Sequence, residues 1–159
     1  MDLELAGKAA LITGASNGIG RAAAEGLAAE GCNLILVLRT AADLAAAKAA
    51  ITEHSTVQID TVAADLSQSS TVERLAKDFP AIDILVNNAG AIPGGSLLDV
   101  DEQTWRKAWD LKVFGYINMC RAYYALMRQK GSGVIINVTA TRHRPMIRNI
   151  SVALLATPR

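Results

Sequence analysis

The segment with the clearest chemical potential is a glycine-rich loop at residues 13–20, which reads TGASNGIG. It follows a short apolar run at residues 9–13 and precedes a helical pattern that starts near Ile19. Glycines let the backbone turn tightly and approach a phosphate closely, and the first turn of a helix offers free N–H groups and a positive dipole end. This context predicts a binding site for the pyrophosphate of a dinucleotide.

Two simpler interpretations of the loop compete with this one. A glycine-rich turn that binds no ligand would have the same composition. A P-loop nucleotide hydrolase would need Gly-Lys-Ser/Thr after the glycines, and this sequence lacks it. The strand before the loop and the helix after it therefore favour the dinucleotide site.

Arg39 bears on which dinucleotide is bound. An acidic residue about 20 positions beyond the glycine loop would bind the ribose 2′-hydroxyl and select NAD. This chain instead has Arg39, followed by Thr40, at the end of the second predicted strand. A guanidinium can pair with a 2′-phosphate, so the sequence favours NADP(H) over NAD(H). A solvated arginine is the alternative, and Asp43 is the only nearby carboxylate that argues for NAD.

The elements that must position these residues alternate between strands and helices. Short apolar runs predict strands at residues 9–13, 34–38, 57–62, 82–86 and 134–138. Capping patterns and apolar periodicity predict helices over residues 19–30, from Thr40, from Ser70 to Pro80, and from Asp101 to Gly131. This order predicts an α/β fold with a doubly wound parallel sheet, a Rossmann-type three-layer sandwich that is incomplete at its C-terminal side. Ligands of such sheets bind at the C-terminal ends of the strands.

Two further motifs identify a family. The loop has the spacing Thr-Gly-x-x-x-Gly-x-Gly, Asp65-Leu66 follows the third predicted strand, and Asn87-Asn88-Ala89-Gly90 follows the fourth. Over residues 5–140 the sequence thereby resembles the short-chain dehydrogenase/reductase family. An unrelated Rossmann-like methyltransferase would leave residues 87–90 unexplained.

The resemblance implies roles for these positions. The loop residues would wrap the pyrophosphate and ribose, Asp65 with Leu66 would contact the adenine, and residues 88–90 would line the floor beneath ribose and nicotinamide. Asp65 could instead initiate a helix, and Asn87 and Asn88 could form a turn that caps the strand. The expected cofactor-binding residues are Gly14, Ser16, Asn17, Gly18, Ile19, Gly20, Arg39, Asp65, Leu66, Asn88, Ala89 and Gly90.

The family's catalytic residues are not found in this sequence. The resemblance implies a Tyr-x-x-x-Lys pair, a serine after the fifth strand and an asparagine in the long helix. No Tyr-x-x-x-Lys occurs, and Tyr116, Tyr123 and Tyr124 are interpreted as core and interface aromatics. The serine position falls on Ala140, the asparagine position falls on Lys112, and Thr139 is a weak substitute because neighbouring strand residues face opposite ways. The catalytic residues therefore stay unassigned, with Thr139 as the one weak candidate.

The composition changes near residue 140. Residues 141–159 contain four arginines and no carboxylate, whereas the rest has more acidic than basic residues. We predict an NAD(P)-binding domain at residues 1–140 and an atypical basic tail at residues 141–159. A reading-frame change or premature end after Ala140 would explain the tail, and so would a genuine short variant. In either case the fifth strand and the long helix should expose apolar area that favours association.

Two functions remain at this stage. One is an NAD(P)(H)-dependent oxidoreductase that acts on a small carbonyl or alcohol, and the other is a non-catalytic dinucleotide-binding or interaction module. With 159 residues and a net charge of +1, the composition gives no case for a nucleic-acid or membrane partner. We further predict a cytoplasmic protein without a metal cofactor, two reduced, buried cysteines, and a possible homo-oligomer through the long helix.

Overall fold

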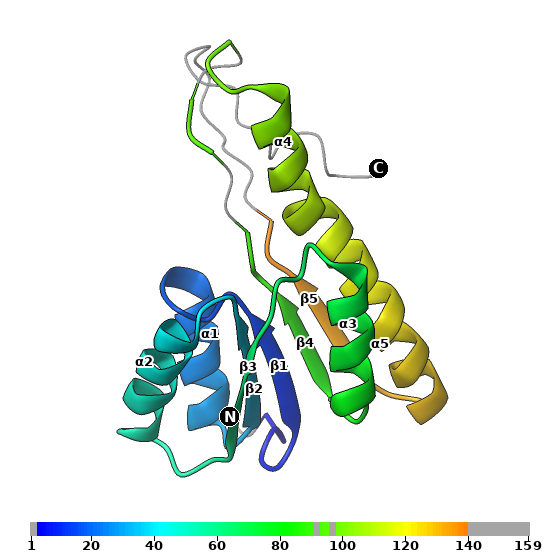
Figure 1. Ribbon diagram of the computed structural model, residues 1–159. Coiled ribbons are helices and arrows are strands. Elements are labelled where there is room, and N and C mark those ends of the chain that lie inside the picture. Colours follow the sequence, from blue (N-terminus) through cyan, green and yellow to red (C-terminus); the bar gives the residue numbers. More distant parts are fainter. Residues whose placement is uncertain (1–2, 91–92, 96–97, 140–159) are drawn as a thin grey trace, which may run out of the picture.

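One parallel sheet organises the molecule. The computed structural model describes residues 3–90, 93–95 and 98–139, and its strands lie in the order β3-β2-β1-β4-β5 (Figure 1). The strands are β1 (Ala9–Thr13), β2 (Asn33–Leu38), β3 (Ile59–Ala63), β4 (Ile84–Asn87) and β5 (Val134–Asn137). The helices are α1 (Gly18–Ala29), α2 (Ala41–Thr52), α3 (Ser69–Asp78), α4 (Glu102–Trp109), η1 (Asp110–Gly115) and α5 (Tyr116–Lys130). The predicted Rossmann-type sheet is confirmed.

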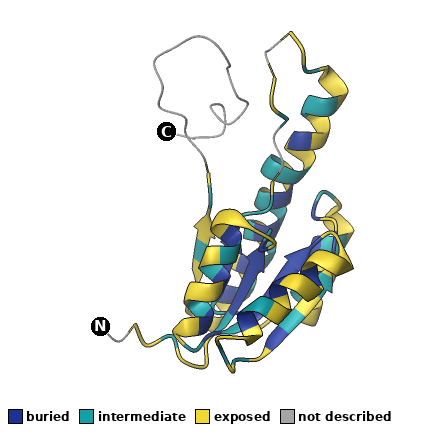
Figure 2. Ribbon diagram, turned by 90° about the vertical axis from the view of Figure 1, so that its left-hand side faces the viewer, coloured by how far each residue is buried: buried dark blue, intermediate teal, exposed yellow. Residues whose placement is uncertain are grey.

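Alternate residues of each strand face two separate cores. On β1, Ile12 points into the layer formed with α1 and α2, whereas Leu11 points into the layer formed with α3 and α5. Both side chains are fully buried. Figure 2 shows the buried strands between the partly exposed helices. This alternation explains why the central strands are continuously apolar: each face of the sheet is covered by helices.

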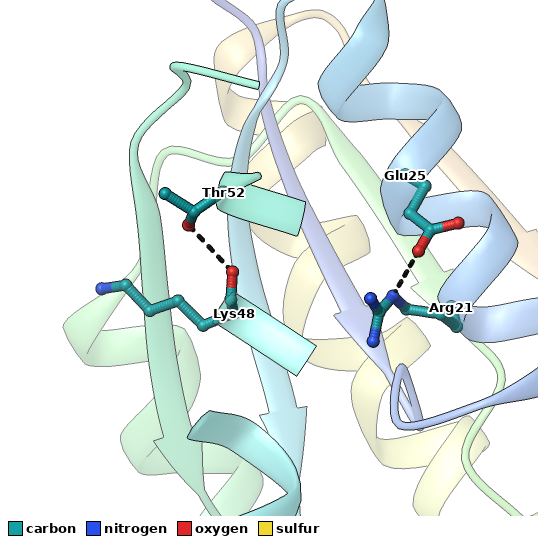
Figure 3. A network of polar contacts seen from close by, with 4 residues as sticks. All are labelled: Arg21, Glu25, Lys48 and Thr52. Carbon is teal, nitrogen blue, oxygen red and sulfur yellow. Dashed lines mark hydrogen bonds and ion pairs between the residues drawn. The ribbon is translucent and has the colours of Figure 1, made fainter. Parts of the chain in front are cut away.

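Local contacts on the outer helices add little to this burial. In α1 the Arg21 Nε and Glu25 Oε1 atoms lie 2.6 Å apart, and in α2 the Thr52 hydroxyl donates to the Lys48 carbonyl at 2.8 Å (Figure 3). Each contact joins residues four apart within one helix. Ion pairs of this kind contribute about 0.3–0.5 kcal/mol, so the two cores carry the fold.

Several predicted boundaries and caps need correction. α3 begins at Ser69, after Gln68, so the predicted Ser70 cap lies inside the helix. At α2 the Thr40 hydroxyl bonds the Asp43 carboxylate and makes no hydrogen bond to the helix backbone. β3 begins at Ile59 rather than at residue 57, because the chain reaches its partner Leu34 on β2 only there. The predicted cap at Asp101 is correct: its Oδ1 accepts the Thr104 N–H at 2.7 Å.

The predicted long helix is interrupted by a π-helical turn, η1. The 3.6-residue period of this segment predicts an apolar stripe made of Trp105, Trp109, Val113, Tyr116, Ile117, Cys120, Tyr124 and Met127. Met127 is buried as predicted, but Trp109, Ile117 and Tyr124 are exposed, and α5 also buries Met119 and Tyr123, which the stripe leaves out. Because η1 changes the number of residues per turn, an uninterrupted 3.6-residue period assigns the wrong face of the helix.

Exposed apolar side chains also occur on β5. Val134 and Ile136 are 53% and 45% exposed, and Phe114 on η1 is 53% exposed.

Of the cysteines, Cys32 is buried as predicted, but Cys120 is only half-buried, because it faces the partly exposed strand β5. Among the described residues, no helix is both long and apolar enough to cross a bilayer.

Candidate functional site

A cleft of about 340 Å³ opens at the C-terminal ends of β1, β2 and β4. The loop before α1 forms one wall, and the segments after β2 and β4 form the others. Most of the residues predicted to bind a cofactor are brought together here: Gly14, Ser16, Asn17, Gly18, Ile19, Arg39, Leu66, Asn88, Ala89 and Gly90. Gly20 lies beneath this wall, and Asp65 lines an adjoining cavity.

Two glycines allow the loop to pack against the segment after β4. Gly14 has φ +73°, and a Cβ there would lie 2.8 Å from the Ala89 Cα. A Cβ on Gly20 would overlap the Asn88 side-chain amide and the Gly14 carbonyl. Side chains at either position would therefore push the loop away from β4 and deform the cleft wall.

The N-terminus of α1 is open toward the cleft. Asn17 precedes the helix with an extended backbone and makes no side-chain capping hydrogen bond, and the first turn contains no acidic residue. The free N–H groups and the positive dipole end are therefore available to an anion. Ile19, in the same turn, is 65% exposed and lines the cleft, so an apolar surface lies beside this anion-binding position.

Thr13 fixes the geometry of the opposite wall. Its buried hydroxyl accepts the backbone N–H groups of Asn88 at 2.9 Å and Ala89 at 3.0 Å and donates to the Val86 carbonyl at 3.3 Å. The Asn88 side chain in turn donates to the Gly14 carbonyl at 2.8 Å. The residues after β4 are thus tied to the end of β1 and to the glycine loop.

We expect Thr13→Val to lower the free energy of unfolding by about 2 kcal/mol, because valine matches the shape of threonine but leaves two N–H groups without their acceptor. Thr13→Ser keeps the hydroxyl and should cost less than about 1 kcal/mol, from one lost methyl group. Urea unfolding of both variants measures the difference. Equal losses in the two variants would show that the hydroxyl does not carry the effect.

Arg39 lies where β2 ends. Its exposed side chain lines the cleft together with Thr40 and Asp43. Asp43, the carboxylate that could favour NAD, accepts a hydrogen bond from the Thr40 hydroxyl. Arg39 therefore presents its charge to the cleft, while one oxygen of Asp43 is already engaged.

The adjoining cavity measures about 530 Å³ and is lined by Arg39, Asp65, Lys107 and Leu111, among others. Asp65 is exposed, and its Oδ1 accepts the Ser67 N–H at 3.0 Å. This bond shapes the turn before α3; it does not cap the helix, whose first residue follows Gln68. Among the described residues, no hydrogen bond or ion pair engages the second carboxylate oxygen of Asp65.

The positions expected to hold catalytic groups show a different arrangement. Lys112 Nζ donates to the Tyr116 hydroxyl at 2.6 Å and to the Val138 carbonyl at 2.9 Å. Burial lowers the pKa of Lys112. The pKa of Tyr116 is raised, mainly by burial and to a smaller extent by the charge of the neighbouring Cys120 thiolate. Thr139 is exposed and follows the end of β5, and Ala140 lies outside the described residues. Of the other tyrosines, Tyr123 is a core residue, whereas Tyr124 is exposed.

Asn87 joins β4 to β5. Its Nδ2 donates to Asn137 Oδ1 at 2.9 Å and to Cys120 Sγ at 3.4 Å. Asn87 therefore has a structural contact of its own, whereas the adjacent Asn88 faces the glycine loop.

Sequence reasoning missed two polar residues of this region. Thr13 was treated only as part of the glycine motif, and nothing in the sequence signals that its hydroxyl reaches residues 88 and 89. Tyr116 was assigned to the core, although its spacing of four residues from Lys112 could have indicated a contact on one helix face.

Comparisons with known proteins agree with this geometry. The sequence model of the family described as short chain dehydrogenase matches residues 8–150. The 3-oxoacyl-(acyl-carrier-protein) reductase of Staphylococcus epidermidis is 34% identical over 137 residues, which are 84% of this chain and 56% of the relative. The L-xylulose reductase of Mesocricetus auratus is 32% identical over 153 residues, which are 96% of this chain and 61% of the relative.

A solved structure shares the fold. The L-sorbose reductase of Gluconobacter frateurii, in complex with NADPH and L-sorbose, superposes with a TM-score of 0.78 at 36% identity, over 86% of this chain and 54% of that one. The chain therefore spans roughly half to three fifths of the length of these relatives. With a family match over most of its length and a parallel sheet that carries the glycine loop, this chain belongs to the short chain dehydrogenase family.

Proposed function

We propose that this chain binds NADP(H) in preference to NAD(H) and serves an NAD(P)(H)-dependent oxidoreductase that acts on a small carbonyl or alcohol. The observation that carries the proposal is the cleft itself: a helix N-terminus without a side-chain cap opens beside an arginine at the end of the next strand. The NADPH bound to the L-sorbose reductase supports the same class of cofactor.

The residues of the cleft fit a dinucleotide. The N–H groups at the start of α1, with Ser16 and Asn17, would hold the pyrophosphate, and Arg39 would pair with a 2′-phosphate. Leu66 in the cleft and Asp65 in the adjoining cavity would contact the adenine, and residues 88–90 would support the adenosine-side ribose and the nicotinamide. When bound, the dinucleotide supplies or accepts a hydride at the substrate carbon.

A second candidate is a dinucleotide-binding module without hydride-transfer chemistry. The specific observation in its favour is Lys112, which stands where the family resemblance implies an asparagine and engages Tyr116 and Val138. An ammonium group cannot accept a hydrogen bond as an asparagine carbonyl can, so Lys112 cannot take the role that the resemblance implies at this position.

Three further inferences accompany the proposal. Residues 1–140 form the NAD(P)-binding domain, and the basic segment at residues 141–159 is a tail outside it.

The chain associates through the long helix, where Trp109, Phe114 and Tyr124 expose apolar area. It works in the cytoplasm, where its two cysteines stay reduced.

Titration of the purified chain with NADPH and NADH, followed by nicotinamide fluorescence, tests the cofactor proposal. We expect saturable binding of both, with NADPH at least about tenfold tighter because of one added charge-assisted pair. Turnover with a panel of ketones and aldehydes then separates the two candidate functions. Binding without turnover would support the module, and absence of binding to either dinucleotide would refute both.

A further inference from the structure

Lys112 occupies a defined position between the ends of β4 and β5. A Cβ built on Gly90 would lie 2.6 Å from the Lys112 Cδ and 3.2 Å from its Nζ, so the lysine stem packs directly against Gly90. Gly90 follows β4 and lines the cleft, and Val138, which accepts a hydrogen bond from Nζ, follows β5. The lysine head group therefore lies at the cleft's border, on the β4–β5 side.

The head group is held in place by several contacts. Nζ donates to the Tyr116 hydroxyl and the Val138 carbonyl, and it lies 4.4 Å from the centre of the Tyr116 ring. Lys112 belongs to η1, where the π-helical turn sets its direction. The two acceptors and the ring favour the protonated amine, whereas burial lowers the pKa of Lys112. We take the hydrogen-bonded amine as the charged group beside Gly90.

The topology determines which half of a dinucleotide would meet this charge. The pyrophosphate belongs at the α1 N-terminus, and Arg39 after β2 would take the adenosine 2′-phosphate. The strand order reverses between β1 and β4, so the other nucleotide must extend over the ends of β4 and β5. The nicotinamide half would then lie on the side of the cleft bordered by Gly90 and Lys112.

The two redox states of nicotinamide differ in charge at this end of the molecule: the oxidised ring carries one positive charge, and the reduced ring is neutral. We propose that Lys112 makes the cleft select the reduced dinucleotide over the oxidised one. This inference rests on the proposed cofactor site. The two redox forms are identical apart from the nicotinamide ring, so the charge of Lys112 would favour one form over the other only through that ring.

The expected effect is an affinity for NADPH that exceeds the affinity for NADP⁺ by roughly tenfold or more, because like charges in a half-buried site repel over several ångströms. A tenfold difference raises the midpoint potential of the bound couple by about 30 mV. The chain would thereby take up the reduced cofactor from a mixed pool and hold it.

The test measures both dissociation constants on the full chain, with NADPH by fluorescence titration and NADP⁺ by competition. We expect Lys112→Met, which removes the charge but keeps most of the stem, to reduce the ratio of the two constants roughly tenfold. Lys112→Arg keeps the charge and should keep the ratio. Lys77→Met is the matched control, because Lys77 is exposed in the last turn of α3, which leads to the start of β4, whereas the cleft lies at the C-terminal ends of the strands.

If Lys112→Met folds and binds NADPH and NADP⁺ with the wild-type ratio of dissociation constants, the inference is overturned. A wild-type chain that binds the two forms equally well would also overturn it. This second measurement needs no variant, so it decides the question even if Lys112→Met does not fold. Failure of the proposed function looks different: neither redox form would bind, and then both proposals fall. Binding of both forms with a ratio that Lys112 does not affect leaves the cofactor site standing and removes only the role of Lys112.

Discussion

Arg39→Asp is expected to reverse the cofactor preference and to lower the ratio of NADPH affinity to NADH affinity by at least about 100-fold. The wild-type guanidinium would form charge-assisted hydrogen bonds to the 2′-phosphate, each of about 1.5–3 kcal/mol. Aspartate removes these bonds and repels the phosphate. It also offers an acceptor to the 2′-hydroxyl of NADH. The exposed position after β2 should accept the change without loss of the fold.

Fluorescence titrations of both reduced dinucleotides measure this ratio. Arg128→Asp is the matched control, because it makes the same change of charge in the last turn of α5. This turn leads to the start of β5, whereas the cleft lies at the C-terminal ends of the strands. The ratio of NADPH affinity to NADH affinity in Arg128→Asp should equal that of the wild type. An unchanged preference in Arg39→Asp would refute the 2′-phosphate role and would direct attention to Asp43, which lines the same cleft.

Gly20→Ala is expected to lower the free energy of unfolding by about 3 kcal/mol and to weaken NADPH binding by tenfold or more. The added methyl group would overlap the Asn88 amide and the backbone carbonyl of Gly14, and a backbone atom cannot move without displacing the loop. Because the hydrogen bond between these same two groups holds the glycine loop against the segment after β4, stability and affinity should fall together.

Gly26→Ala supplies the matched control within the same helix. Gly26 is exposed, and a Cβ there would meet nothing within 4 Å. Alanine should stabilise α1 by about 0.5–1 kcal/mol, because glycine loses more backbone entropy in a helix. Urea unfolding and NADPH titration of the two variants give the comparison. If Gly20→Ala were as stable as Gly26→Ala, the close packing at Gly20 would be wrong.

The order of the elements followed from local patterns. The strands are short and apolar because both faces of the sheet are covered, and a parallel connection needs a helix between strands. Gly31 and Gly131, which end α1 and α5, both have positive φ as expected for glycines at helix ends. Starts of elements were less predictable: Ser70 resembled a cap, but α3 begins one residue earlier, at Ser69.

The face of the long helix could not be read from periodicity. A regular 3.6-residue period placed Ile117 and Tyr124 inward, whereas the π-helical turn η1 places Met119 and Tyr123 there. Such a turn is stabilised by the contacts it makes, including the hydrogen bond from Lys112 to Val138, which follows the distant strand β5. A local pattern contains no information on those contacts.

The sequence by itself determined the family, the parallel α/β fold and the residues of the glycine loop, because these depend on backbone freedom and on spacing along the chain. Only the tertiary structure decided that Thr13 supports residues 88 and 89, that Gly20 packs beneath the loop, and that Lys112 stands beside Gly90. These contacts join residues about 20 to 75 positions apart. Their distances are set by how the strands align in the sheet, which no single segment of the chain specifies.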